Sequence, residues 1–376
     1  MGRKRIAIEA SSMLRISGRY LGGIGRTVLE LVRAIVALQP EEEIVLFSQR
    51  LRGERLGCYG LDVKRIHLPI PRWKTVESVM KSLGVTEMLC HADLYHAPAN
   101  YAPLRDLDRT VVTLHDAMFL TYPEQHLGHD SMAKQVPEFI RKCRAVITCS
   151  NHSKKDIVES IGVAPDRVHV IYWGTNPEHF RPDGDMDGIR ERLRRRFGLE
   201  RPYYLSVSCD IGRKNTERLI RVYAGIAAEG SPNDLVLVWR NPPEHIREEC
   251  THGALAGRVH FLSGPDDCEL ADLYRGAMTM AFPSIYEGFG LPILEAMSCG
   301  TAVITSKAAS MPEVGGDAAV YVDPLSDESI RAAMELFENS DPALDGIRER
   351  SLAQASRFSW EKCARQTLDV YRTYIG

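Results

Sequence analysis

Short apolar runs alternate with stretches of helical length along most of the chain. In the first half, the runs predict strands at residues 6–9, 43–47, 93–96, 110–114, 145–148 and 168–171. In the second half, they predict strands at residues 203–207, 235–238, 259–262, 278–283 and 302–304. Strands that are buried on both faces of a parallel sheet form such continuous apolar runs, and helices between them provide the crossovers. We therefore expect an α/β fold with parallel sheets.

A polar break separates the two series of strands. Residues 174–188 are rich in Pro, Asp and Gly, and a basic helix is predicted at residues 189–197. A chain of 376 residues is longer than a single hydrophobic core usually supports. We therefore predict two doubly wound, Rossmann-like domains, at residues 1–178 and 179–358, followed by a last helix near residues 360–374.

The composition is that of a globular protein with nearly balanced charge. Hydrophobic residues make up 44% of the chain and charged residues 26%, and the formal net charge is −3. This balance predicts neither nucleic-acid binding nor bulk attraction to an anionic membrane. No apolar run reaches about 18 residues, and the basic residues at positions 3–5 pass directly into the first strand, so we expect neither a membrane span nor a signal peptide. A cytoplasmic protein is expected.

Nine cysteines are scattered along the chain without any C-x-x-C pair. Several of them, such as Cys149, Cys209 and Cys299, fall in apolar or strand-end settings. Free cysteines behave as small apolar residues, and disulfides are rare in reducing compartments. We therefore expect reduced, structural thiols and no metal site built from them.

The segment at residues 284–300, SIYEGFGLPILEAMSCG, places two carboxylates at a strand-to-helix junction. Gly288 and Gly290 supply a turn that a ligand can approach closely. The free N–H groups and the dipole of the following helix favour phosphate oxygens. Glu287 and Glu295 are unfavourable beside an anion unless they accept hydrogen bonds from hydroxyl groups, which sugars provide. Alternatively, they are a charge at the helix start and a solvated helix residue.

Two cations lie at a second strand-to-helix junction. Arg213 and Lys214 follow the strand at residues 203–207 and precede a predicted helix at residues 216–228. Positive side chains at a helix N-terminus are unfavourable against the helix dipole by about 0.3–1 kcal/mol, so a bound anion would explain them. A solvated helix start is the alternative.

A glycine-rich run at residues 22–25, which includes Gly23, lies between the first strand and a predicted helix at residues 27–38. This strand, loop and helix form another junction that tolerates anions. The glycines do not have the G-x-G-x-x-G spacing of dinucleotide sites, so a nicotinamide cofactor is not expected. A flexible turn is the alternative to a binding loop.

Two histidines stand at strand ends in the first half. His115 follows the strand at residues 110–114, at the edge where open α/β sheets bind their ligands. His96 ends the strand at residues 93–96 and could contact an acceptor. A buried structural histidine is the alternative at both positions.

The segment at residues 284–300, with the loop at residues 311–316, resembles the motif of two glutamates separated by seven residues in retaining glycosyltransferases of family 4, also called glycosyl transferases group 1. These enzymes have the GT-B fold, in which two Rossmann-like domains face each other across a cleft. The resemblance implies that Glu287 contacts the transferred sugar, that Glu295 binds the ribose hydroxyls of the nucleotide, and that the last helix, within residues 359–376, packs on the first domain. It places near the diphosphate the backbone N–H groups of Gly288, Phe289, Gly290 and Leu291.

The same resemblance implies roles for the cations and for the first domain. Arg213 and Lys214 would stabilise the departing nucleoside diphosphate, although many family members carry a further Arg in the region where this chain has Ser208. The glycine loop with Gly23 would close over the donor phosphate, and His115 would hydrogen-bond the donor sugar. Closure of the two domains would then complete the site.

Two stretches with Asp-x-Asp spacing, at residues 106–108 and 183–187, are candidates for a metal site. Neither follows a strand at a ligand-binding edge, so both are interpreted as solvated or helix-capping acids. Because Lys214 is available to neutralise a diphosphate, we expect no metal and no cofactor.

The expected reaction is the retaining transfer of a hexose from a nucleotide diphosphate sugar to a saccharide. In the front-face mechanism that the resemblance implies, the leaving phosphate helps to deprotonate the acceptor hydroxyl. Groups aimed at the phosphate would then supply much of the catalysis. A likeness to bacterial mannosyltransferases that extend polysaccharide chains, such as O-antigen, favours mannose and GDP-mannose, although the residues themselves do not distinguish guanine from uracil.

The expected acceptor is a saccharide or a lipid-linked saccharide. The basic, apolar-faced segment at residues 72–83 would suit peripheral contact with the inner membrane, or would be a helix packed on its own domain. Three other functions stay open: a sugar-nucleotide 2-epimerase on the same fold, a protein that binds a sugar nucleotide without transfer, and a Rossmann oxidoreductase.

Overall fold

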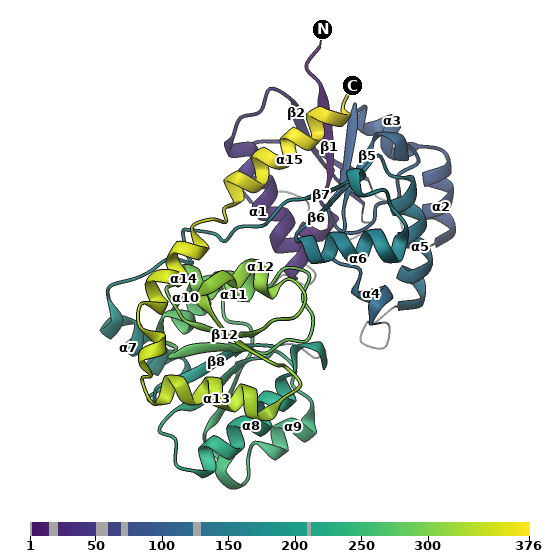
Figure 1. Cartoon of the computed structure of the whole chain (residues 1–376). Coiled ribbons are helices and arrows are strands. Elements are labelled where there is room, and N and C mark those ends of the chain that lie inside the picture. The colour runs from purple at the N-terminus through teal and green to yellow at the C-terminus, as the bar shows by residue number, and fades with distance from the viewer. Residues whose placement is uncertain (1, 15–21, 50–58, 69–73, 123–128, 209–211) are drawn as a thin grey trace. The chain divides into compact units, whose positions relative to one another are not determined.

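The computed structural model describes residues 2–14, 22–49, 59–68, 74–122, 129–208 and 212–376 (Figure 1). Contacts within the chain divide it into two compact units. Unit 1 comprises residues 1–174 and 359–376, and unit 2 comprises residues 175–358. The boundary predicted at residue 178 lies close to this division. Each unit is built around its own sheet.

Unit 1 contains a seven-stranded parallel sheet in the order β3-β2-β1-β4-β5-β6-β7. Its strands are β1 Arg5–Glu9, β2 Glu43–Gln49, β3 Lys64–Leu68, β4 Leu94–Ala97, β5 Thr110–Thr113, β6 Ala145–Thr148 and β7 Val168–Val170. Its helices are α1 Gly23–Ala37, α2 Lys74–Ser82, α3 Val85–Cys90, α4 Met118–Thr121, α5 His129–Lys142, α6 Asn151–Ile161 and α15 Trp360–Tyr374.

Two hydrophobic cores lie on the two faces of this sheet. Successive residues of a strand point to opposite faces, so β1 contributes to both cores. Ile6 and Ile8 pack with residues of α1 and α15, whereas Ala7 packs with residues of α5 and α6. Burial on both faces explains why the inner strands form continuous apolar runs.

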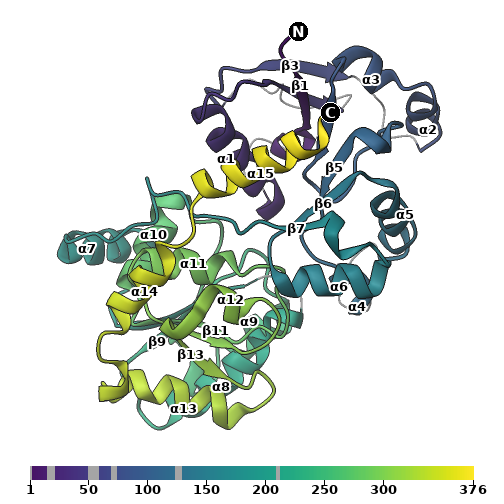
Figure 2. The same cartoon turned by 45° about the horizontal axis from the view of Figure 1, so that its top comes forward.

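The last helix, α15, belongs to unit 1 and lies beside α1 (Figure 2). Trp360 and Tyr371 are buried in the core that α15 shares with α1. The Tyr371 hydroxyl lies 2.6 Å from Nδ1 of His96, which ties the helix to β4. Gly174 permits a close approach of the chain to the start of α15, because a Cβ there would lie 2.3 Å from the Trp360 nitrogen.

Unit 2 contains a six-stranded parallel sheet in the order β10-β9-β8-β11-β12-β13. Its strands are β8 Tyr203–Val207, β9 Asp234–Val238, β10 Val259–Leu262, β11 Thr279–Phe282, β12 Val303–Ser306 and β13 Ala319–Val322. Its helices are α7 Met186–Phe197, α8 Thr216–Ala228, α9 Glu244–Glu249, α10 Asp267–Gly276, α11 Leu291–Ser298, α12 Met311–Gly315, α13 Asp327–Glu338 and α14 Ile347–Ala355.

The predicted fold class is confirmed, because both sheets are parallel and their strands alternate with helices along the chain. The structure adds two strands that the apolar pattern does not predict, β3 and β13. Each of them forms an edge of its sheet. Among the described helices, none combines the length and the apolar character that crossing a membrane requires.

Seven cysteines fall within the described residues, and none of these seven forms a disulfide. Cys268 is exposed and the other six are buried. Burial raises the pKa of Cys143 and Cys299 to about 12, so these thiols stay protonated. They therefore act as small apolar residues, whereas Cys58 and Cys209 lie outside the described residues.

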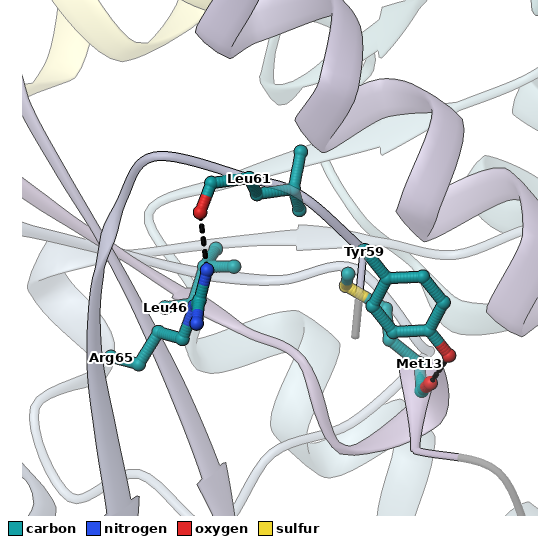
Figure 3. Close-up of a pocket in the computed structure, with 5 residues that line it drawn as sticks. All are labelled: Met13, Leu46, Tyr59, Leu61 and Arg65. Atoms are coloured by element: carbon teal, nitrogen blue, oxygen red, sulfur yellow. Dashed lines mark hydrogen bonds between the residues drawn. The ribbon is translucent and has the colours of Figure 1, made fainter. Parts of the chain in front are cut away.

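A small pocket in unit 1 lies beside the end of β2 and the start of β3 (Figure 3). The hydroxyl of Tyr59 donates a hydrogen bond to the carbonyl of Met13, and the guanidinium of Arg65 donates to the carbonyl of Leu61. Leu46 completes the lining. Because its polar groups already bond to the backbone, this pocket serves packing and offers no polar constellation for a ligand.

Candidate active site

Two loops of unit 2 meet at the carboxyl ends of the central strands of its sheet. The first follows β8 and contains a short 3-10 turn, Gly212–Lys214, before α8 begins at Thr216. The second follows β11 and leads into α11. Because β8 and β11 are neighbouring parallel strands, their carboxyl ends lie side by side, where open α/β sheets bind ligands.

Three side chains that the sequence analysis singles out come together here. One oxygen of Glu287, Oε1, lies 2.6 Å from Nη1 of Arg213 and 2.8 Å from Nζ of Lys214. The three side chains are largely buried, with 8%, 16% and 11% of the Glu287, Arg213 and Lys214 side chains exposed. Burial alone would raise the pKa of Glu287, but the adjacent ammonium and guanidinium groups hold that pKa below its ordinary value.

This ion pairing gives a second explanation for the cations at the start of α8, which the sequence analysis explains by a bound anion. The carboxylate of Glu287 supplies the counter-charge from within the chain. Arg213 and Glu287 lie far apart in the sequence, so the local pattern does not show that they meet. Two cations and one carboxylate still leave an excess of one positive charge at this sheet edge.

A serine that the sequence analysis does not single out also contacts the carboxylate. The Ser284 hydroxyl lies 2.9 Å from Oε1 of Glu287, and both groups are buried. Oε1 therefore faces three donor groups. The other oxygen, Oε2, receives no hydrogen bond from the residues that the structure describes, so it keeps its capacity as an acceptor.

Hydrogen bonds to the backbone fix the shape of the second loop. The Ser310 hydroxyl lies 2.8 Å from the carbonyl of Glu287 and 2.9 Å from that of Phe289. The backbone N–H of Ile285 donates to the carbonyl of Arg213 over 2.7 Å, and Nη1 of Arg213 lies 2.9 Å from the carbonyl of Tyr286. The two loops are thus joined through backbone as well as side-chain contacts, which preorganises the cations and the carboxylate.

The start of α11 presents backbone N–H groups at the same sheet edge. Gly290 adopts a left-handed conformation, with φ of 101°, immediately before the first helical residue, Leu291. Within the described residues, no acceptor lies within bonding reach of the N–H of Gly290 or Leu291. Gly288 belongs to the same loop, whereas the ring of Phe289 is buried edge-to-face against Phe358. Residues 288–291 therefore contribute backbone rather than side chains, whereas Glu287 of the same loop contributes its carboxylate.

The second glutamate of the segment has a different partner. Glu295 lies on α11, and its Oε2 accepts a hydrogen bond from the hydroxyl of Tyr274 over 3.0 Å. Tyr274 lies near the end of α10 and is fully buried. The sequence analysis does not single out Tyr274, because no local pattern links a tyrosine on one helix to a glutamate on another.

Ser208, in the region where the family that this chain resembles often carries an arginine, directly follows β8. Its hydroxyl forms a hydrogen bond with the hydroxyl of Thr216, the first residue of α8. Within the described part of unit 2, the cations that contact Glu287 are therefore Arg213 and Lys214.

His115 lies in unit 1, directly after β5, and is buried. Its Nε2 lies 3.0 Å from the carbonyl of Pro98 and so carries the hydrogen, which leaves Nδ1 as an acceptor. That Nδ1 atom has no hydrogen-bond partner among the described residues. Burial lowers the pKa of His115 to about 4, although the bond to Pro98 opposes this shift. The imidazole is therefore neutral near pH 7, and its ring packs edge-to-face against Trp173.

The other first-half candidates differ in their surroundings. Gly23 is the first residue of α1, and a Cβ at this position would meet no atom within 4 Å. The suggestion that His96 contacts an acceptor is wrong. Its buried ring lies 2.8 Å from the Thr113 hydroxyl and 2.6 Å from the Tyr371 hydroxyl, so both of its nitrogens have partners inside the core. Gly23 and His115 belong to unit 1 and the other predicted site residues belong to unit 2.

The acidic stretches have local structural roles. Asp185 caps α7 by accepting a hydrogen bond from the N–H of Gly188 over 3.0 Å. Asp183 accepts from the N–H of Asp185, and Asp106 accepts from Arg109. In the part of the chain that the structure describes, His, Cys, Asp and Glu side chains form no cluster of three or more that could hold a metal ion.

Comparisons with known proteins agree with this arrangement. Residues 21–179 match the family model described as Glycosyltransferase Family 4, and residues 189–355 match the model described as Glycosyl transferases group 1. The chain is 28% identical over 374 residues to O-antigen chain mannosyltransferase B of Escherichia coli, which covers 94% of this chain and 96% of that protein.

A second relative is much longer than this chain. The serotype-specific mannosyltransferase WbdA of Escherichia coli is 30% identical over 292 residues, which amount to 75% of this chain and 35% of that protein. Among solved structures, Anabaena Alr3699/HepE in complex with UDP and glucose has a TM-score of 0.76 at 18% identity, over 99% of this chain and 100% of that chain. The two parallel sheets, the family matches and these relatives together show that the chain belongs to the family 4 and group 1 glycosyltransferases and is a glycosyltransferase with the GT-B fold.

Proposed function

We propose that this protein transfers mannose, with retention of configuration, from GDP-mannose to a saccharide acceptor during bacterial polysaccharide synthesis. The observation that carries the proposal is the contact of Glu287 Oε1 with Arg213 and Lys214 at the carboxyl ends of β8 and β11. The names of the relatives, O-antigen chain mannosyltransferase B and serotype-specific mannosyltransferase WbdA, support mannose as the sugar.

Arg213 and Lys214 take the part of leaving-group stabilisers. As the bond between the anomeric carbon and the phosphate oxygen breaks, negative charge grows on the nucleoside diphosphate. Fixed cations aimed at that charge lower the barrier, because they need no reorganisation during the reaction. The N–H groups of Gly290 and Leu291 add backbone donors at the same sheet edge, together with the loop of Gly288 and Phe289.

Glu287 connects the cations to the sugar. Its Oε1 faces Arg213, Lys214 and Ser284, whereas its Oε2 is available to accept hydrogen bonds from hydroxyl groups of the transferred hexose. The carboxylate would thereby position the sugar relative to the groups that bind the phosphate. Glu295, on α11, would accept hydrogen bonds from the ribose hydroxyls.

The proposed chemistry is a front-face displacement. The bond between the anomeric carbon and the phosphate oxygen breaks, the acceptor oxygen bonds to the anomeric carbon from the same face, and the acceptor proton passes to the departing phosphate. His115, whose neutral ring keeps Nδ1 as an acceptor, would hydrogen-bond a hydroxyl of the donor sugar. Gly23, at the start of α1, would provide backbone next to the donor phosphate. Neither a metal nor a cofactor takes part in this scheme.

The acceptor is proposed to be a saccharide carried at a membrane surface. Val79, Leu83, Met88 and Leu89 are each more than half exposed, and all four lie on α2, α3 or the turn between them. The two helices contact each other, and exposed apolar side chains on adjoining elements are typical of interaction surfaces. Lys64 and Arg65 are exposed on β3, beside α3, and their charge suits anionic lipid headgroups.

A donor panel tests the proposed reaction. Purified protein is incubated with GDP-mannose, GDP-fucose, UDP-glucose, ADP-glucose or dTDP-glucose, with and without a mannose-containing oligosaccharide and a metal chelator. We expect GDP release that requires the oligosaccharide, occurs with GDP-mannose, persists with the chelator and yields an α-linked product. Transfer from UDP-glucose but not from GDP-mannose would contradict the donor assignment. Release of free sugar without transfer to the oligosaccharide would contradict the proposed transferase activity.

A further inference from the structure

The two glutamates of one segment are held in different ways. Glu287 faces two cations and a serine hydroxyl, whereas Glu295 accepts from the phenol of Tyr274 over 3.0 Å. Tyr274 is fully buried and Glu295 is 6% exposed, so this hydrogen bond is shielded from water. A buried hydrogen bond between a neutral donor and a carboxylate fixes the position of the carboxylate without adding positive charge.

We propose that Tyr274 is a positioning residue that orients Glu295 toward the ribose of the donor nucleotide and thereby makes the site selective for ribonucleotides. The inference rests on the proposed function, because it takes the nucleotide diphosphate sugar as the ligand. A carboxylate offers about four acceptor directions, and the phenol occupies one of them on Oε2. A carboxylate that is held by such a bond can also accept from the two neighbouring hydroxyls of a ribose.

Tyr274 is itself held by contacts from two parts of unit 2, at Thr301 and at residues 180–181. The carbonyl of Tyr274 accepts a hydrogen bond from the Thr301 hydroxyl over 2.7 Å. Its ring packs edge-to-face against Phe180, with ring centroids 6.1 Å apart. The next residue, Arg275, donates from Nε to the carbonyl of Arg181 over 2.9 Å, which anchors the segment that carries Phe180. Side chains that are held by such neighbours keep one conformation, as a preorganised binding site requires.

Loss of the phenol oxygen has a specific consequence. In a Tyr274→Phe variant, the ring contacts stay and Glu295 loses one buried donor, so the position of the carboxylate is less tightly constrained. Binding of the ribose hydroxyls should weaken, whereas binding of the base and the diphosphate should not. The effect is therefore expected in the ratio of affinities for a ribonucleotide and its 2′-deoxy analogue rather than in the turnover of bound donor.

Calorimetric titration of the full chain tests this inference with GDP, 2′-deoxy-GDP, UDP and 2′-deoxy-UDP. The wild type should prefer the ribonucleotide of the base that it binds. Tyr274→Phe should reduce that preference by roughly tenfold, the loss expected for one charged hydrogen bond. It should also raise the donor KM while kcat stays within about twofold.

Another buried tyrosine of unit 2 provides a matched control. Tyr203 is also buried, and its hydroxyl donates to the carbonyl of Leu273, the residue before Tyr274, over 2.8 Å. Tyr203→Phe removes a comparable hydrogen bond without touching Glu295, so the ribose preference should be unchanged. In a Glu295→Gln background, Tyr274→Phe should have little further effect, because the residue that it positions is altered.

Three results would overturn the inference in distinguishable ways. If the wild type binds GDP or UDP with a ribose preference that Tyr274→Phe leaves unchanged, the role of Tyr274 is wrong and the proposed function stands. If the wild type binds a nucleotide but shows no ribose preference, the role of Glu295 is wrong as well. If the wild type binds neither nucleotide, the proposed function itself fails, and this inference with it.

Discussion

Burial sets the protonation state of two histidines in unit 1. Burial lowers the pKa of His96 to about 3 and that of His115 to about 4. Both residues are therefore neutral near pH 7. Both nitrogens of His96 and one nitrogen of His115 are hydrogen-bonded within unit 1. Strand-end position in the sequence predicts that His115 is placed toward a ligand edge, but it does not distinguish His115 from His96, because the partners of His96 come from distant parts of the chain.

This burial predicts how stability depends on pH. In the unfolded chain a histidine titrates near pH 6.5. Between about pH 6.5 and pH 4 the unfolded chain binds protons that folded unit 1 excludes, so stability is present above this window and is lost as the pH falls through it. Each histidine should contribute at most about 1.4 kcal/mol per pH unit.

Hydrogen exchange of the strands of unit 1 at about pH 7 and about pH 5, corrected for intrinsic rates, measures this dependence. His96→Gln should weaken the pH dependence of the opening free energy, because one titrating group is removed. His245, which is exposed on α9, is the matched control, and His245→Gln should leave the slope unchanged. An unchanged slope in His96→Gln would contradict the prediction.

The candidate site residues could be predicted from the sequence where they belong to a local motif. Glu287, Glu295, Arg213 and Lys214 stand next to strand ends and helix starts, which the apolar pattern locates. The residues that hold them were not predictable. Tyr274 reaches Glu295 from another helix, and such long-range hydrogen bonds leave no trace in local spacing.

At the scale of elements, the apolar pattern predicts the inner strands that the structure describes but only two of the four described edge strands, β7 and β10. β6 and β8 have the predicted bounds, because strands buried on both faces consist of apolar residues. β3 and β13 lie at sheet edges, where only part of each strand is buried. An edge strand tolerates charged residues, so the sequence of β3, KRIHL, does not form an apolar run.

The exposed apolar residues of α2 and α3 predict binding to anionic membranes. Sedimentation with vesicles of phosphatidylglycerol and phosphatidylethanolamine measures it. The double variant Leu83→Ser with Met88→Ser should bind at least about fivefold more weakly, because it removes apolar area that would enter the interface. Binding of the wild type should also fall with added salt, since Lys64 and Arg65 contribute through charge.

A matched control comes from unit 2. Leu325 is as exposed as these residues, with 63% of its surface accessible, and it lies between β13 and α13. Leu325→Ser should bind vesicles like the wild type. Equal loss in both variants would indicate a general effect of surface hydrophobicity, and no loss in the double variant would contradict the membrane surface.

At the scale of the whole molecule, the chain builds two units and then returns to the first. The Pro, Asp and Gly content of residues 174–188 predicts a boundary there, and the division falls at the start of this stretch. The family resemblance implies that the last helix packs on the first domain, whereas the local sequence does not identify its partner. The packing of Trp360 and Tyr371 with residues of α1 supplies that information.

The central claim is that Glu287, with Arg213 and Lys214, forms the donor site of a glycosyltransferase. Steady-state transfer from GDP-mannose by Glu287→Gln tests it most directly, because glutamine keeps the size of the side chain and removes its charge. Glu335→Gln on α13 is the matched control, since Glu335 also pairs with an arginine, Arg331, and neither residue contacts Glu287 or Lys214. We expect Glu335→Gln to retain full activity and Glu287→Gln to stay folded with kcat reduced by at least about 100-fold. Near-normal transfer by folded Glu287→Gln would contradict the account.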